Sequence, residues 1–288
     1  MRLSGAAIGP DTVMVWTGAR ELTVFGRAGS QWSFTVPAAP LAWQIAADGV
    51  RIVDARGTIH RYSDAGTYEG AVALAEAPGT INQAALSADG RWLAILTDEI
   101  QLFEAGAWRP WAFVHRRPTG WREVGVDISA NGRYVLARFE TFSDLGLELG
   151  DNSEGLVISA QDGNVVYRHV MQQLPALEVA LSPDGRWVAR CEDDERIFVD
   201  ETTSMRPVLR LEPHGRVTRF GFSDRLFGVL YHHGLAVVDV AAARQAWLDL
   251  PEHFEHLVLC ERDVVVVHPE LGAWWVPLAS LAFTAAEG

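Results

Sequence analysis

The chain has 288 residues, of which 49% are hydrophobic and 21% charged, so it can build a large core and lacks the composition of a disordered protein. Its formal net charge is −13, which argues against nucleic acid as a partner because like charges repel. All 24 of its Lys and Arg positions are Arg, which excludes Schiff-base and lysine-nucleophile chemistry.

Neither a targeting segment nor a membrane-spanning segment is predicted. The first residues, MRLSGAAIGPDTVMV, contain no basic stretch followed by a sustained apolar one, so we expect no signal peptide. No apolar run reaches the roughly 20 residues that cross a bilayer. The only two cysteines, Cys191 and Cys260, are expected to be buried, unpaired thiols in a cytoplasmic protein.

A tight-turn motif recurs along the chain, most clearly as LSADGRW, ISANGRY and LSPDGRW. The acidic or amide residues at the centre of the seven copies are Asp11, Asp48, Asp89, Asn131, Asp184, Asp224 and Asp263. Successive copies are 37, 41, 42, 53, 40 and 39 residues apart. A period of about forty residues is typical of the four-stranded blades of a β-propeller.

Each repeat is predicted to contain four strands and no helix. An apolar run precedes the turn and another follows it, as LEVAL and RWVARC do around Asp184. Asp and Gly suit the tight turn of a β-hairpin, and the flanking alternation suits its two strands. A second strand-like pair follows, as in ERIFVDETTSMRPVLRL after Asp194. The fold class predicted is therefore all-β.

Seven stacked repeats predict a monomeric, seven-bladed β-propeller with four antiparallel strands in each blade, forming one domain over residues 1–288. The expected blades are 3–38, 41–76, 81–115, 121–173, 176–213, 216–252 and 254–286. We expect each blade to use consecutive sequence. Closure by a swapped terminal strand is the alternative, because the last strand, near 281 to 284, is weakly defined.

The SPDG-type turns resemble the bacterial propeller repeats grouped with the WD-repeat and TolB-like superfamilies, and the resemblance covers nearly the whole chain. It implies the fold and little about function, because such repeats serve many roles. The Trp-Asp dipeptide and the recurring Gly-His of eukaryotic WD repeats are missing, so their hydrogen-bonded tetrad is not expected. Trp92, Tyr134 and Trp187 follow the turn at matching positions and are interpreted as blade-packing residues, with ligand stacking as the alternative.

The SPDG turns are expected on one face of the propeller, and the loops between second and third strands, with the inter-blade connections, on the other. Variable loops on a rigid scaffold commonly carry function. The 53-residue interval places an acidic insertion, residues 140–154, on that second face, and long loops are either functional or disordered. Residues 192–195 add four acidic positions in blade 5, either a solvated turn or a sector that receives a basic partner segment.

Two other patterns fall on the same expected face. The segment VHRRPTGWRE, residues 114–123, combines Arg and Trp, residue types favoured in interface hot spots. Its alternative role is to pair with the acidic insertion. Six histidines fall in loops or strand ends of blades 5 to 7, namely His214, His232, His233, His253, His256 and His268. Clustered imidazoles can bind zinc or titrate near neutral pH, and scattered surface histidines are the plainer interpretation.

The sequence favours a non-enzymatic scaffold that binds a protein partner on this second face, because no nucleotide-binding loop or nucleophile motif is present. No cofactor or metal is expected. The residues predicted to contact the partner are Arg116, Arg117, Trp121, Arg122, Phe142, Asp144, Leu147, Glu148, Asp193, Asp194, Tyr231, His232 and His233.

Two alternatives stay open. One is a hydrolase such as a lactonase, with a site at the central channel drawn from Glu123, Glu178, Arg219 and Glu255 and often with Ca²⁺. The other is a permanent subunit of a larger protein assembly, which differs from a scaffold in the size and lifetime of its interface.

Overall fold

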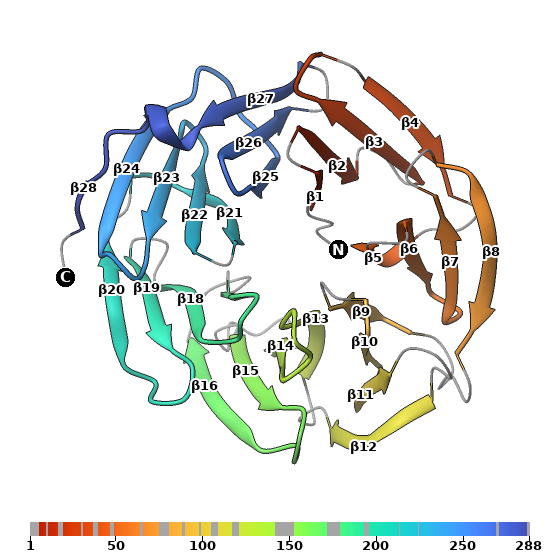
Figure 1. Ribbon diagram of the computed structural model, residues 1–288. Coiled ribbons are helices and arrows are strands. Elements are labelled where there is room, and N and C mark those ends of the chain that lie inside the picture. Colours follow the sequence, from red (N-terminus) through yellow and green to blue (C-terminus); the bar gives the residue numbers. More distant parts are fainter. Residues whose placement is uncertain are drawn as a thin grey trace, which may run out of the picture. The chain divides into compact units, whose positions relative to one another are not determined.

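A computed structural model gives the architecture of the chain (Figure 1). The residues that it describes are 6–9, 11–16, 20–29, 31–36, 40–46, 49–63, 66–74, 81–87, 90–97, 99–104, 109–116, 121–141, 153–171, 179–192, 196–212, 214–223, 225–268 and 271–286. For 6–9, 45–46, 109–116, 121–124, 140–141 and 171 it describes the backbone alone.

The chain is an all-β, seven-bladed β-propeller whose blades are antiparallel sheets. It divides into two compact units, one containing residues 38–187 and 202–205 and the other 2–37, 188–201 and 206–288. No helix in the described part of the chain is long and apolar enough to cross a membrane.

The first unit contains the second, third and fourth sheets. The second sheet is β5 (Pro40–Ala46), β6 (Gly49–Asp54), β7 (Thr58–Tyr62) and β8 (Tyr68–Ala73). The third is β9 (Gln83–Leu86), β10 (Trp92–Leu96), β11 (Glu99–Glu104) and β12 (Arg109–Arg116). The fourth is β13 (Trp121–Ile128), β14 (Tyr134–Thr141), β15 (Ser153–Ser159) and β16 (Val165–Met171).

The second unit contains the first, sixth and seventh sheets. The first sheet is β1 (Ala6–Gly9), β2 (Thr12–Trp16), β3 (Glu21–Gly26) and β4 (Gln31–Thr35). The sixth is β21 (Val217–Phe222), β22 (Leu226–Tyr231), β23 (Gly234–Asp239), β24 (Arg244–Asp249) and β28 (Thr284–Ala285). The seventh is β25 (His256–Leu259), β26 (Asp263–His268) and β27 (Gly272–Pro277). The fifth sheet is β17 (Val179–Leu181), β18 (Trp187–Glu192), β19 (Arg196–Glu201) and β20 (Pro207–Leu211), and the division between the units falls within it.

The prediction of four strands per blade holds for the first five sheets and is wrong for the last two. The chain leaves β27 through a 3-10 turn, Leu278–Ser280, and its last strand pairs with the outer edge of β24, with Gln245 opposite Thr284 (Figure 1). Leu281 and Phe283 pack on the core shared by the sixth and seventh sheets. Burial of these apolar side chains accounts for the path, because apolar burial is the main favourable term in folding.

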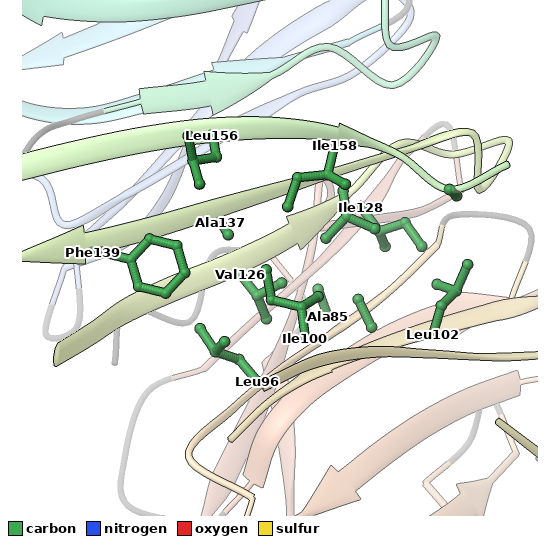
Figure 2. Close-up of a cluster of buried hydrophobic side chains, with 13 residues drawn as sticks. Ala85, Leu96, Ile100, Leu102, Val126, Ile128, Ala137, Phe139, Leu156 and Ile158 are labelled. Atoms are coloured by element: carbon green, nitrogen blue, oxygen red, sulfur yellow. The ribbon is translucent and has the colours of Figure 1, made fainter. Parts of the chain in front are cut away.

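Neighbouring sheets within each unit share their cores. Between the third and fourth sheets, Leu96 and Ile100 lie against Val126, Ala137 and their neighbours (Figure 2). In the second unit the first and seventh sheets also pack together, through Val13, Phe25, Val265 and Val267 with their neighbours. The first sheet is built entirely from N-terminal strands, so the described part of the chain contains no strand swapped into it.

The chemistry predicted for the repeated turn is present. At the fifth-blade copy, Ser182 Oγ donates to Asp184 Oδ1 at 2.7 Å and accepts from the Trp187 amide at 2.8 Å. The Arg186 amide donates to the same carboxylate oxygen at 2.9 Å, and Gly185 closes the turn with a φ of 75°. Asn131 has the same role in the preceding copy. Asp89 lies outside the described residues.

The interpretation of Trp92 and Tyr134 as packing residues is confirmed. Each aromatic ring lies against the turn glycine of the next repeat, Trp92 against Gly132 and Tyr134 against Gly185. A Cβ at Gly132 would lie 2.0 Å from Cδ1 of Trp92. The glycine therefore provides the space for the ring, and at these two copies the motif couples the turn to the blade before it.

Candidate functional site

Most of the predicted contact residues fall where the structure gives no side-chain description. Outside the described residues are Arg117, Phe142, Asp144, Leu147, Glu148, Asp193 and Asp194. Backbone alone is described for Arg116, Trp121 and Arg122. The side chains of Tyr231, His232 and His233 are described, and they lie at one end of the sixth sheet.

The acidic insertion is shorter than predicted. β14 runs on to Thr141, which pairs with Trp121, and Glu140 pairs with both Arg122 and Ser153. Glu154 lies within β15, where its carboxylate is buried and contacts the Arg168 guanidinium. Both ends of the predicted loop are therefore strand, because extending the hairpin satisfies their backbone groups. The backbone at Trp121 lies opposite Thr141, the last described residue before 142–152.

The end of the sixth sheet at which β21 begins and β22 ends will be called the loop end of that sheet. Strand register brings Val217, Tyr231, Gly234 and Asp249 together there. The same end of the seventh sheet is the start of β25, which contacts β21 and β22. Residues from three separate stretches of sequence thus meet in one place.

The prediction that Tyr231 contacts a partner directly is wrong. Its side chain is 1% exposed and packs against the rings of His214 and Trp247, with centroids 6.1 and 5.4 Å away. Burial, and then the nearby Cys191, raise the pKa of its phenol. β22 is buried at all six positions, so its last residue faces the interior although it borders a turn.

Trp247 and His214 form the outer part of this aromatic cluster. Their ring centroids are 4.3 Å apart, His214 is exposed, and Trp247 is 37% exposed. The indole Nε1 donates to Asp249 Oδ1 at 2.8 Å. A Cβ at Gly234 would lie 2.1 Å from the indole, so this glycine admits the ring. The result is a fixed, partly exposed aromatic surface.

Three histidines form a second group next to this cluster. The His232 ring lies 4.3 Å from that of His233 and 4.6 Å from that of His253, measured between centroids. Nδ1 of His253 is buried and has no hydrogen-bond partner among the described residues. Desolvation, and then the proximity of His233, His253 and Arg216, lower the pKa of His232. The imidazoles are therefore near one another and near positive charge.

A cavity of about 380 Å³ opens beside His232 and His253. It is lined by Arg216, Val217, Thr218, Arg219, His232, His253, Phe254 and Glu255. Arg219 Nε donates to the main-chain oxygen of Glu255 at 3.1 Å, which ties the start of β21 to the segment before β25. The volume of the cavity falls within the range of small-ligand sites.

The sequence placed six histidines at this end, and the structure separates their roles. His214 belongs to the aromatic cluster, and His268 Nδ1 accepts a hydrogen bond from the Leu271 amide at 3.1 Å. His256 is buried, with its Nδ1 unpaired among the described residues. Only His232, His233 and His253 come together. No three His, Cys, Asp or Glu side chains in the described ranges are arranged to hold a metal ion.

Of the four residues proposed for a hydrolase, Arg219 and Glu255 line the cavity. Glu178 lies outside the described residues, and Glu123 is described by its backbone alone. The sequence suggested Arg219 and His232 for different functions. Their position in one cavity depends on the packing of β25 against β21, which the sequence does not reveal.

We expect His256 to make the protein less stable in mild acid. Burial, and then the charge of Arg219, lower its pKa to about 4, whereas an unfolded histidine titrates near 6.5. The unfolded chain binds the proton more readily, so stability is lost as pH falls from about 6.5 towards 4. From pH 7 to pH 5 the loss is about 2 kcal/mol.

The measurement is urea denaturation of wild type and His256→Leu at both pH values. The variant should lose less stability on acidification than wild type, and the exposed His233→Gln should behave as wild type. An unchanged pH dependence in His256→Leu would refute the assignment of this effect to His256.

Comparisons with known proteins support the fold and name no family. No protein-family model matches the chain, and no curated protein matches it. Among solved structures, it is similar to a chain of the mitotic checkpoint complex at 11% identity and a TM-score of 0.66, covering 96% of this chain and 87% of that one. It is also similar to the β-propeller domain of Cps50 (Swd1) from Myceliophteria thermophila, at 10% identity and a TM-score of 0.64, covering 96% and 94%. The likeness establishes the β-propeller fold.

Proposed function

We propose that this protein is a non-enzymatic scaffold that binds a protein or peptide partner at the loop ends of its sheets. The observation that carries the proposal is the group of exposed or partly exposed His214, His232, His233 and Trp247 beside a cavity. Aromatic residues held in place by their neighbours give contact area at low entropic cost, and they are enriched in interface hot spots.

The opposite ends of the sheets support the same choice by contrast. At the repeated turns, Ser182, Asp184 and their counterparts direct their hydrogen bonds into the turn itself. Aromatic rings of the neighbouring repeat fill the space beside the turn glycines Gly132 and Gly185. The side chains of the turns therefore have a role in folding. No such role explains the exposed side chains at the loop end of the sixth sheet.

In the first unit, the proposed partner contacts are Arg116, Arg117, Trp121, Arg122 and the acidic insertion. In the second unit they are His232 and His233, with Trp247 added; the buried Tyr231 supports Trp247. One chain of similar fold is part of the mitotic checkpoint complex. The SPDG-type turns favour the bacterial, TolB-like branch of the repeat. Two buried cysteine thiols, Cys191 and Cys260, are consistent with a cytoplasmic location.

The test is affinity capture from a lysate of the source organism with wild-type and variant chains. His232→Ala with His233→Ala, and separately Trp121→Ala with Arg117→Ala, should each reduce capture of the partner by roughly tenfold or more, the usual loss at a hot spot. Arg133→Ala, an exposed change at a repeated turn, is the matched control and should leave capture unchanged. Thermal midpoints identify any variant that is unfolded.

The opposite pattern would contradict the proposal. If capture survives both loop-end variants and is abolished by Arg133→Ala in a folded chain, the partner binds at the turns.

A further inference from the structure

We propose that the cavity at the loop end of the sixth and seventh sheets binds a phosphoryl group carried by the partner. This inference rests on the proposed function, because it names the chemistry by which that surface recognises its partner. It follows from which side chains the fold brings to one cavity.

The cavity wall is cationic within a chain of net charge −13. Arg216 and Arg219 come from the segment that opens β21, His232 from the turn between β22 and β23, and His253 from the segment before β25. The His233 ring lies next to that of His232. Glu255 is the acidic residue among those lining the cavity. With neutral imidazoles the two Arg and one Glu give a net charge of +1, and two protonated imidazoles raise it to +3.

The donors are of the kind that bind tetrahedral oxyanions. A guanidinium offers paired N–H groups that match phosphate oxygens, and protonated imidazole donates from both ring nitrogens. The Arg216 side chain is exposed and makes no salt bridge with any described residue. His253 Nδ1 is buried without a partner in the described part of the chain. A bound oxyanion would supply acceptors for the exposed Arg216 guanidinium.

The geometry favours an anion over a metal. His232 lies close to His233 and His253 and also to Arg216, whose charge opposes a cation. A phosphoryl group carries a charge of about −1.5 to −2 and three acceptor oxygens, which suits two guanidiniums and neighbouring imidazoles better than a single carboxylate does.

The cavity should also respond to pH. His232, with a pKa held below its ordinary value, is mainly neutral at pH 7 when the cavity is empty. A bound dianion favours the protonated imidazole, so binding takes up a proton and affinity increases as pH falls from 8 to 6. The titratable and charged groups that face His232 are His233, His253 and Arg216, and Arg219 and Glu255 also line the cavity. His256 is buried and is affected by the charge of Arg219.

The first experiment uses sulfate, whose charge stays constant between pH 6 and pH 8. Histidine side-chain resonances are recorded by NMR during a sulfate titration of the full chain. We expect saturable shifts at His232 and His253 and an affinity several-fold higher at pH 6. Arg216→Gln and Arg219→Gln should each weaken binding by about tenfold, as expected for loss of a charge-assisted hydrogen bond.

Two controls accompany this titration. Arg210→Gln removes an exposed Arg of β20 that pairs with Glu212, outside the cavity, and should bind sulfate as wild type does. Because Arg216 is exposed, its variant should fold even if the Arg219 variant does not. No saturable shift at millimolar sulfate, or equal weakening by Arg210→Gln, would overturn the inference.

The second experiment identifies the source of the phosphoryl group. N-acetyl-phosphoserine amide should bind at least as tightly as inorganic phosphate, and N-acetyl-serine amide should not bind. If inorganic phosphate binds and the blocked phosphoserine does not, the cavity holds the free ion and the proposal of a partner-borne group is wrong. If a blocked aspartate binds as tightly as the phosphoserine, the cavity selects carboxylates and the proposal is again wrong.

Failure of this inference can be told apart from failure of the proposed function. Capture that survives phosphatase treatment of the lysate, yet still depends on His232 and His233, would keep the scaffold function and reject the phosphoryl group. Capture that is lost on phosphatase treatment and in the Arg216→Gln chain would support both.

Discussion

Replacing Gly132 with Ala should lower the free energy of unfolding by about 2–4 kcal/mol. The residue has a φ of 68°, which costs an alanine roughly 1 kcal/mol. Its new Cβ would also lie 2.0 Å from Cδ1 of Trp92, and forcing that ring out of its packed position adds about 1–3 kcal/mol. The change is measured by urea denaturation at constant pH.

Gly29→Ala is the matched control. Gly29 has a φ of 85°, but a Cβ there would have no atom within 4 Å, so only the backbone cost remains. A second variant, Gly132→Ala with Trp92→Leu, should be less destabilised than the sum of its single changes. If Gly29→Ala and Gly132→Ala lower the free energy of unfolding equally, the packing of Trp92 does not require a glycine at position 132.

Replacing Arg190 with Met should lower the free energy of unfolding by about 3–5 kcal/mol. This is the range observed when one partner of a buried ion pair is removed and the other is left unpaired. Arg190 Nε lies 2.6 Å from Asp200 Oδ2, and the two side chains are 11% and 3% exposed. The guanidinium also contacts Glu192 and lies 4.4 Å above the Phe198 ring. Without it, the Asp200 carboxylate would be buried close to another acidic side chain.

Two comparisons isolate this effect. Arg210→Met removes an exposed Arg that pairs with Glu212 at 2.8 Å and should change stability by less than about 1 kcal/mol. Adding Asp200→Asn to Arg190→Met should recover part of the loss, because the uncompensated charge is removed. If Arg190→Met proves no worse than Arg210→Met, the pair contributes no more than a surface ion pair.

The sheet count could be predicted because the information that fixes it is local. The turn is formed by local hydrogen bonds that involve Ser182 and Asp184, next to Gly185. The motif that forms each hairpin can therefore be recognised within seven residues of sequence. The packing of Trp92 against Gly132 couples one copy to the next. A regular spacing of such turns therefore reports the repeating architecture before any long-range contact is known.

What could not be predicted depends on contacts between distant segments. The pairing of Thr284 with Gln245 joins residues 39 apart, and its strand is too short to leave an alternating pattern. Tyr231 borders a polar turn, which suggested exposure, yet its side chain is enclosed by His214 and Trp247.

The site was predicted only in part for the same reason. His232 and His233 were identified from their place beside a turn, and they are exposed as expected. The partnership of His232 with His253 and Arg219 exists because β25 packs against β21. A single sequence gives the residues of such a cavity but not which of them meet.

The most direct test of the binding account is hydrogen–deuterium exchange of the chain with and without its captured partner. We expect slower exchange in the partner complex at residues 214–219, 231–234 and 249–255, which form the loop end of the sixth and seventh sheets. Exchange at the repeated turns, residues 129–134 and 182–187, should be unchanged. Protection of those turns with no change at the loop end would show that the partner binds elsewhere than proposed.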